Sequence, residues 1–217
     1  MKIRDILDTQ QQLDEITLRQ AAAAGMIGAA AITPLTLTQP LTTRPAVART
    51  ASVSQPQVQL PRAQRETAVA RRDEFLAQQI VDKYSVDSML AKEVVKLAHK
   101  YEHPDFPTAK DILAIVGIES SFRPTIKSQL RTDPARGLMQ VRPGVWKIDP
   151  EELEDIEGNI MHGASILRRY YNKLDNKQAA VQAYNVGITD FRQGVKNPRY
   201  LSKYQKEYGR YVAGGDY

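Results

Sequence analysis

The sequence contains no cysteine, which excludes disulfides, thiolate metal sites and cysteine nucleophiles. It has few histidines, of which His99 and His103 are spaced to share one face of a helix. Pro104 follows directly and no further ligand stands nearby, whereas a protein zinc site needs more ligands than such a pair. We therefore interpret the two as surface histidines at a helix end and expect neither a metal nor an organic cofactor.

Long apolar runs are also lacking. A membrane-spanning helix takes about 20 consecutive apolar residues, and the Ala/Gly-rich run 21–33 is shorter and only weakly apolar. It has the length of the apolar region of a secretion signal, but acids balance bases in the preceding residues 2–20, unlike in a typical signal. The run is either a secretion signal, an export segment of another kind or an Ala-rich helix used in assembly, and membrane contact is left open.

Acidic residues are absent between residues 34 and 65, where prolines recur among Thr, Ser and Gln. This composition cannot supply a packed core and is typical of an extended, disordered linker. Residues 2–20 before it have apolar spacing compatible with a short amphipathic helix. We therefore divide the chain into an N-terminal helix with its Ala-rich segment (1–33), a Pro-rich linker (34–65) and a domain with a leading helix (66–217).

The period-two alternation of β-strands is missing from the remainder, which instead has apolar residues at helical spacing. Thr108 is a candidate N-cap, with Asp111 in the following first turn and Pro124 as the stop. We predict a mainly α domain, with helices over the ranges 66–83, 87–101, 108–123, 150–174, 177–186 and 198–212.

The charge is mildly basic, at +5 with a sequence pI of about 9.3. A basic excess suits an anionic polymer such as nucleic acid, a membrane surface or the cell wall. The excess is diffuse and no nucleic-acid-reading motif is present, so we do not expect nucleic acid as the partner.

Glu119 ends a helix that is otherwise nearly all apolar, over residues 112–118. Partial burial there would raise the pKa of the carboxyl group, and a protonated carboxylic acid can protonate the leaving oxygen of a glycoside. The alternative is a glutamate that emerges at the rim and is solvated.

Two further segments carry polar or aromatic groups that suit sugar binding, residues 137–140 (GLMQ) and 183–187 (AYNVG). Taken alone, the first is a turn before a helix and the second a helix C-cap with a buried tyrosine. Together with the ESSF segment 119–122, and in this order, they resemble the soluble lytic transglycosylase family, with its goose-type-lysozyme-like catalytic domain. The resemblance covers residues 86–211, slightly over half of the chain, and leaves the N-terminal third uncovered.

The resemblance implies a lysozyme-like helical fold and a peptidoglycan lytic transglycosylase, with Glu119 as the single catalytic acid and base. Glu119 would protonate the oxygen between N-acetylmuramic acid and N-acetylglucosamine, and the muramoyl 6-hydroxyl would then give a 1,6-anhydro product. Ser120 or Ser128 would position groups near the scissile bond, which leaves the choice between the two serines open.

The same resemblance implies the substrate-binding residues. Gln140, with the backbone of Met139, would line the glycan groove. Tyr184 and Asn185 would orient Glu119 and the acetamide, and Tyr200 would be the later tyrosine of the cleft.

Two alternatives stay open. The segment 127–136 departs from the family pattern, and if it brings Asp133 into the cleft, Asp133 would activate water and the enzyme would hydrolyse as a lysozyme. The domain could instead bind peptidoglycan as a component of a virion or secretion apparatus, with residues 1–65 contacting the larger assembly. Either way we expect peptidoglycan as the partner, and a location in the periplasm or cell envelope.

Overall fold

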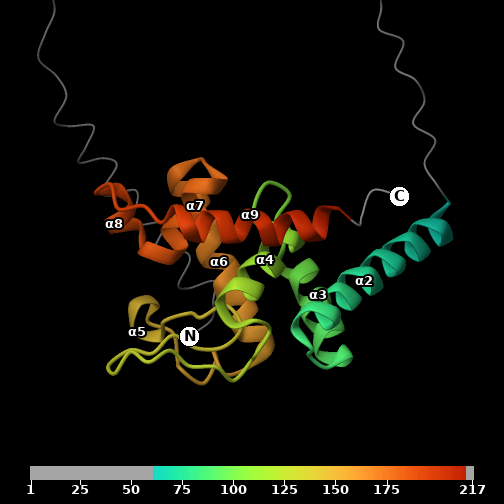
Figure 1. The fold of residues 1–217 in the computed structure, drawn as a ribbon, viewed down its shortest axis with the longest axis horizontal. Helices are drawn as coiled ribbons and strands as arrows, with labels where there is room; N and C mark the ends of the chain where they lie inside the picture. The colour runs from blue at the N-terminus through green and yellow to red at the C-terminus, as the bar shows by residue number, and fades with distance from the viewer. Residues whose placement is uncertain (1–60, 214–217) are drawn as a thin grey trace, which may run out of the picture. The chain divides into compact units, whose positions relative to one another are not determined.

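The computed structural model describes residues 61–213, which form α-helices joined by turns and loops. No β-strand occurs in this range, which confirms the prediction of a mainly α fold (Figure 1). The predictions for residues 1–60, including the Ala-rich segment and nearly all of the linker, lie outside the described residues. The helices are α2 (Arg62–Tyr84), α3 (Ser88–Tyr101), α4 (Ala109–Ser120), α5 (Pro143–Trp146), α6 (Ile156–Leu174), α7 (Lys177–Val186), α8 (Ile188–Arg192) and α9 (Pro198–Val212).

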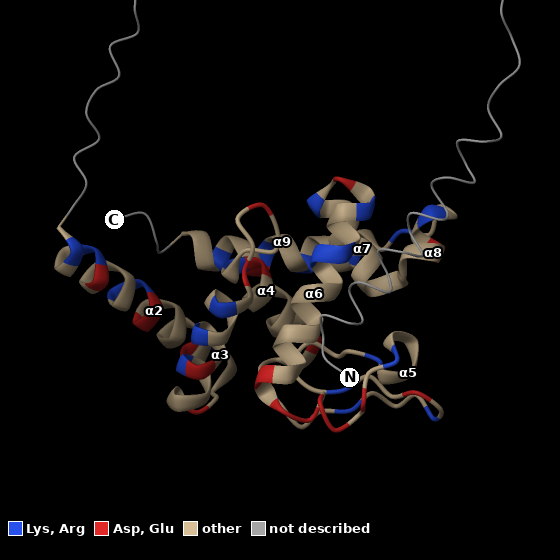
Figure 2. Cartoon of the chain, turned by 180° about the vertical axis from the view of Figure 1, so that it is seen from behind, with Lys and Arg blue, Asp and Glu red and all other residues tan. Residues whose placement is uncertain are grey.

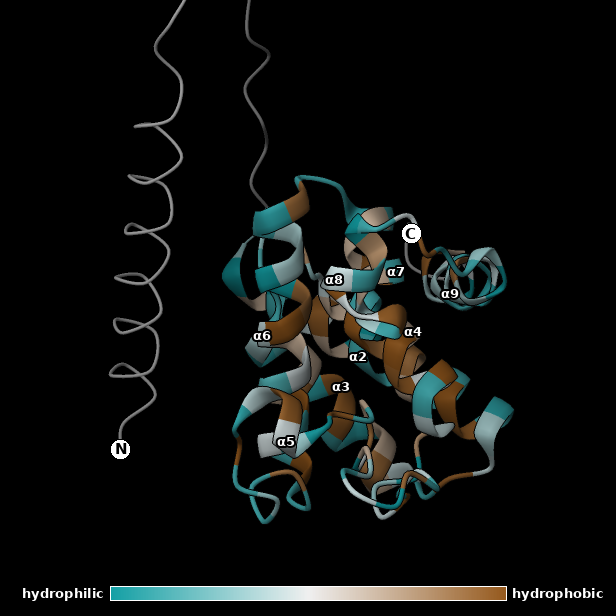
Figure 3. Cartoon of the chain, turned by 90° about the vertical axis from the view of Figure 1, so that its left-hand side faces the viewer, coloured by the Kyte–Doolittle hydropathy of each residue, from teal (hydrophilic) through white to brown (hydrophobic). Residues whose placement is uncertain are grey.

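Helix α4 is the buried centre of the domain. Its sequence is apolar on almost all sides, as expected of a helix that is surrounded by others, and α3 and α9 both pack on it (Figure 3). The predicted cap is confirmed, because the Thr108 side chain accepts a hydrogen bond from the Asp111 backbone NH while the Asp111 carboxylate accepts one from that of Thr108.

Helix α9 packs across α4 and buries one stripe of its own surface (Figure 3). Tyr200, Tyr204, Glu207 and Tyr211 are spaced three or four residues apart and are all buried. The Tyr204 hydroxyl donates a hydrogen bond to the Asp111 carboxylate. The stripe therefore ties the C-terminal helix to the N-terminal end of α4.

Helix α2 joins the domain through its C-terminal half. Leu76, Ala77 and Ile80 are buried, whereas residues 61–72 are almost entirely exposed. Lys83 and Tyr84 both bond the buried carboxylate of Glu207, and the Tyr84 Oη···Glu207 Oε1 distance is 2.7 Å. The leading helix is thus connected to α9, 123 residues further along the chain.

The predicted ranges for α3, α7 and α9 agree with the structure to within one residue. The predicted start of α2 at residue 66, the end of α4 at residue 123 and the start of α6 were wrong, since α2 begins at Arg62 and α4 ends at Ser120. The prediction began α6 near Pro150, whereas turns occupy residues 150–154 and Asp155 caps α6, its carboxylate accepting the backbone NH of Gly158 at 2.8 Å. The short helices α5 and α8 were not predicted. None of the helices in residues 61–213 is long and apolar enough to cross a membrane.

Candidate active site

Glu119 lies in the last turn of α4, where the buried helix reaches the surface of the domain. Burial disfavours the ionised carboxylate and raises the pKa of Glu119 to about 7. A hydrogen bond from Tyr200 and the charge of Lys203 oppose this rise only in part. The carboxyl group can therefore hold a proton near neutral pH and release it, as an acid–base catalyst requires.

Tyr200 is the direct partner of this carboxyl group. It lies in the first turn of α9, 81 residues from Glu119, and its hydroxyl donates to Glu119 Oε1 at 2.5 Å. Burial and the nearby Glu119 carboxylate raise the pKa of Tyr200 well above its usual value, so the phenol stays protonated and acts only as a donor in this bond.

Tyr184, on α7, completes the group of polar side chains around Glu119. Burial raises the pKa of Tyr184 strongly, and the charge of Glu119 adds to the rise. Its hydroxyl donates to the backbone carbonyl of Met139 at 2.8 Å, which ties the GLMQ turn to α7. The sequence-predicted residues Glu119, Tyr184, Tyr200 and the Met139 backbone are thus gathered at one place from α4, α7, α9 and a loop.

The Asn159 side chain anchors the GLMQ turn, residues 137–140. This buried side chain on α6 accepts the Met139 backbone NH at 2.8 Å and donates to the carbonyls of Arg136 and Leu153 at 2.8 and 2.9 Å. Gly137 has φ of +70°, and a Cβ there would lie 2.3 Å from Asn159 Nδ2, so the turn needs glycine at this position. Met139 itself is fully buried, and its backbone NH and carbonyl are bonded to Asn159 and Tyr184.

The Gln140 side chain supports the same loop. Its Nε2 donates to the carbonyls of Gly137 and Ile126 at 2.9 and 3.2 Å, and its backbone has a positive φ of 48°. The side-chain NH₂ of Gln140, a predicted groove residue, is therefore bonded within the loop, and its side-chain oxygen is left for other contacts.

Asn185 is exposed at the C-terminal end of α7. Its Oδ1 accepts a hydrogen bond from Asn197 Nδ2 at 2.7 Å, and Asn197 also caps α9 by accepting the Tyr200 backbone NH at 3.0 Å. Asn197 therefore bonds both Asn185, a predicted site residue, and the backbone of Tyr200, whose hydroxyl bonds Glu119.

The two candidate serines lie differently from the rest of the predicted site. Ser120 is 1% exposed and its hydroxyl donates to the Val116 carbonyl within α4. The Ser128 hydroxyl accepts the Ala135 backbone NH at 2.9 Å and closes the base of the loop 128–135. Both hydroxyls are therefore engaged in local structure.

Asp133 is anchored at the α5 corner. Its Oδ1 accepts the Gly144 backbone NH at 2.8 Å, and its Oδ2 pairs with Arg142 Nε at 3.2 Å. Both carboxylate oxygens thus have partners outside the group formed by Glu119, Tyr184 and Tyr200. Within residues 61–213, no three His, Asp or Glu side chains gather in a way that could hold a metal ion.

Sequence reasoning missed Asn159, Asn197 and Lys203 as residues of the site. Two of them could have been found from the sequence. Asn197 directly precedes Pro198 and is a typical N-cap, and Asn159 is a polar residue on the otherwise apolar face of α6. Lys203 carries no such signal, because only the packing of α9 on α4 brings its charge near Glu119.

The chain was compared with known proteins. A search of curated proteins gave no match. The family model described as the Transglycosylase SLT domain matches residues 98–207, a span that covers just over half of the 217 residues. The matched span runs from the end of α3 to Glu207 on α9 and includes the group around Glu119. The chain belongs to the Transglycosylase SLT domain family, in agreement with the resemblance seen in its sequence, and is therefore of the lytic transglycosylase type that acts on peptidoglycan in the cell envelope.

Proposed function

We propose that the protein is a lytic transglycosylase that cleaves the β-1,4 bond between N-acetylmuramic acid and N-acetylglucosamine, with Glu119 as its only acid and base. The observation that carries the proposal is the desolvated Glu119 carboxyl group, whose pKa is raised to about 7 while Tyr200 fixes its orientation. Such a group is matched to proton transfer near neutral pH.

The chemistry requires one group that first gives and then takes a proton. Glu119 protonates the glycosidic oxygen, the bond from the muramoyl anomeric carbon to that oxygen breaks, and N-acetylglucosamine leaves with the proton. The muramoyl 6-hydroxyl oxygen bonds to the anomeric carbon, and its proton passes to Glu119. The 1,6-anhydro ring forms without water, and Glu119 regains its starting state.

The position of the Asp133 carboxylate favours this route over hydrolysis. A glycosidase that uses water or a covalent intermediate needs a second carboxylate across the scissile bond. Both oxygens of Asp133, the candidate for that role, are already bonded at the α5 corner. An internal hydroxyl has a high effective concentration and needs no such partner.

Tyr184 and Asn185 are proposed to face the substrate, Tyr184 by orienting Glu119 and Asn185 by bonding an acetamide. Gln140 and the Met139 backbone are proposed to form this part of the groove, Gln140 by presenting its side-chain oxygen and Met139 by holding the wall through its backbone bonds to Asn159 and Tyr184. For Ser120 and Ser128 the hydrogen bonds described above favour a structural part in the site.

The test is mass spectrometry of the products that the full chain releases from purified peptidoglycan. We expect anhydromuramoyl ends from the wild type and from Asp133→Asn, and none from Glu119→Gln, whose amide cannot donate and reclaim the proton. Reducing muramoyl ends that disappear in Asp133→Asn would instead establish a lysozyme. Substantial activity of a folded Glu119→Gln variant would overturn the assignment of the acid.

Residues 1–65 are proposed to connect the catalytic domain to a larger virion or envelope assembly. The proposal is supported by their composition, an Ala-rich segment followed by a proline-rich stretch without acidic residues.

A further inference from the structure

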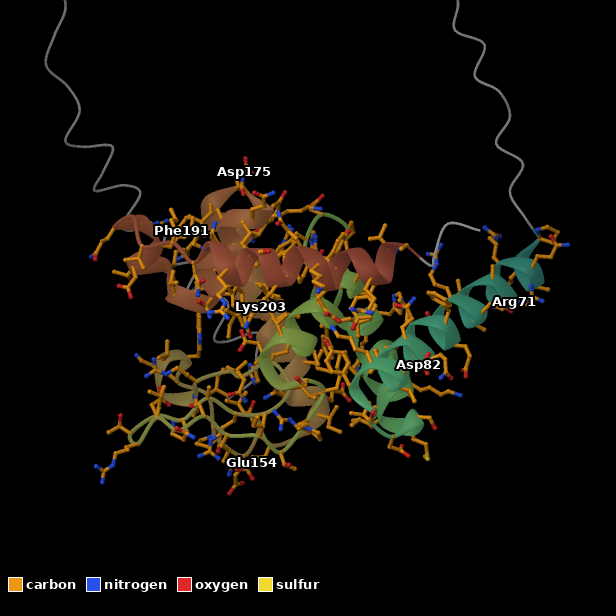
Figure 4. All side chains as sticks on the ribbon, in the orientation of Figure 1. Arg71, Asp82, Glu154, Asp175, Phe191 and Lys203 are labelled. Atoms are coloured by element: carbon orange, nitrogen blue, oxygen red, sulfur yellow. The ribbon has the colours of Figure 1, made fainter. Side chains whose placement is uncertain are left out.

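Lys203 lies on α9 beside the catalytic carboxyl group. It follows Tyr200 by three residues, and residues so spaced are neighbours on a helix, about 5–6 Å apart at their Cβ atoms. Tyr200 bonds Glu119 directly, so Lys203 is placed at the same edge of α9, where Figure 4 shows it below the helix axis. Its positive charge lowers the pKa of Glu119.

The Lys203 ammonium group is not used by the fold. Its side chain is exposed, and it makes no ion pair or hydrogen bond with any residue of the range 61–213. The other basic residues of α9, Arg199, Lys206 and Arg210, are spaced three or four residues apart in one row with Lys203 and so share a side of the helix. Figure 2 shows Lys and Arg in blue along α9, whose one acidic residue is the buried Glu207. When Glu119 is protonated, as the first step of the reaction requires, Lys203 has no ion-pair partner within residues 61–213, since Glu207 of the same helix is buried and paired with Lys83.

We propose that Lys203 binds a carboxylate that the substrate carries on its muramoyl residue, and so determines specificity for charged glycan. The inference rests on the proposed function, because that function places the muramoyl anomeric carbon at Glu119. The lactyl group of the same sugar ring is attached two carbons away from that carbon. A carboxylate at or beyond the lactyl group therefore lies within reach of a cation that stands next to Glu119.

Two sources supply this carboxylate, the lactyl group itself when no stem peptide is attached, and the stem peptide when one is. Both offer the same partner for an ammonium group, and a contact of this kind on an exposed surface is modest in strength and sensitive to salt. Lys203 would then act mainly in binding the substrate, in addition to the small lowering of the Glu119 pKa by its charge.

The experiment compares wild type, Lys203→Met and Lys203→Arg on soluble, uncrosslinked glycan strands. We expect Lys203→Met to raise KM about two- to fivefold with little change in kcat, and Lys203→Arg to restore the wild-type value. Lys206→Met is the matched control, since it removes the same charge from the same helix one turn further from Tyr200. It should behave as the wild type does.

Three substrates separate the sources of the carboxylate. The first carries stem peptides, the second has lost them to an amidase and exposes the lactyl carboxylate, and the third has its carboxylates converted to methylamides. A raised KM of Lys203→Met on the first substrate alone would show that Lys203 binds a carboxylate of the stem peptide. A raised KM on the second substrate would show that it binds the lactyl carboxylate. On the third, Lys203→Met and wild type should coincide.

Binding of the same strands to chains that also carry Glu119→Gln keeps this result independent of turnover. Lys203-dependent binding without cleavage by any chain would leave the inference standing and overturn the proposed function. Cleavage by the wild type, with equal KM for Lys203→Met on every substrate, would overturn the inference alone. An equal loss in Lys203→Met and Lys206→Met would do the same, because it would show a general effect of surface charge.

Discussion

At the scale of single residues, the candidate catalyst is defined by what surrounds it. Glu119 is the last acidic group on a buried helix, and its desolvation outweighs the bond from Tyr200 and the charge of Lys203. Had the same glutamate projected into water, its pKa would have stayed near the ordinary value and it would be ionised at neutral pH. The raised pKa therefore comes from position and not from residue type.

The pH dependence of the reaction follows from this shift. The free enzyme must carry the proton on Glu119, so we expect kcat/KM to fall as the pH rises through about 7. Tyr200→Phe removes a donor that favours the ionised form, so the pKa of Glu119 should rise and the alkaline limb should move to higher pH. Since the carboxyl group also loses its orientation, kcat should fall about ten- to a hundredfold.

Steady-state rates between pH 5 and pH 9 (about two units either side of the Glu119 pKa) check this prediction. Tyr208→Phe removes a hydroxyl from the same helix at a place that does not bond Glu119, and its pH profile should match the wild type. An alkaline limb that stays in place or moves to lower pH in Tyr200→Phe would contradict the assigned bond.

At the scale of helices and turns, the GLMQ turn depends on α6. Gly163 of α6 faces Met139 so closely that a Cβ at this position would lie 2.7 Å from Met139 Cβ and 2.3 Å from its Sδ. The Met139 backbone is in turn bonded by Asn159 and Tyr184. A larger side chain at position 163 of α6 would therefore displace Met139 and, with it, the GLMQ turn at the candidate site.

We expect Gly163→Ala to lower the free energy of unfolding by about 1–3 kcal/mol, because the core around Met139 has no room for the added methyl group. Urea denaturation measures the loss, and kcat should fall as the turn shifts. The control is Gly209→Ala on α9, where a Cβ would meet no atom within 4 Å. That change should stabilise the helix by about 0.5–1 kcal/mol. Equal stabilities of the two variants would contradict the close packing of α6 on the turn.

At the scale of the whole molecule, the folded domain extends beyond the residues that match the family. The match begins at residue 98, yet α2 packs on α3, and its Tyr84 ring lies 4.9 Å from that of Phe122, just after the end of α4. Lys83 and Tyr84 also bond Glu207, which is 3% exposed. A buried carboxylate that loses its partners is strongly destabilising.

We therefore expect a fragment of residues 61–217 to unfold at the same temperature as the full chain and to cleave peptidoglycan. A fragment of residues 86–217, which lacks α2, should lose about 3–5 kcal/mol of stability, because it lacks the buried α2 residues Leu76, Ala77 and Ile80 and the bonds from Lys83 and Tyr84 to Glu207. Thermal unfolding followed by circular dichroism compares the two. Equal melting temperatures would mean that α2 is not an integral part of the domain.

Much of the helical fold could be predicted because its signals are local. The N-caps Thr108 and Asn197 and the buried apolar face of α4 are each encoded within one helix and its flanks. The start of α6 could not be predicted in this way. Residues 150–154 are acidic and resemble a first helical turn, whereas in the structure they form turns, and the carbonyl of Leu153 is bonded to the Asn159 side chain.

The sequence by itself determined the mainly helical class, most helix boundaries and the family, and it made Glu119 the candidate acid, because periodicity, caps and short motifs are properties of neighbouring residues. Only the tertiary structure decided the raised pKa of Glu119, the anchoring of Asp133 at the α5 corner and the place of Lys203 near the Glu119 carboxyl group. Each of these depends on groups far apart in the chain, as in the bond from Tyr200 to Glu119 across 81 residues. Desolvation and electrostatic interactions arise only when packing brings such groups together.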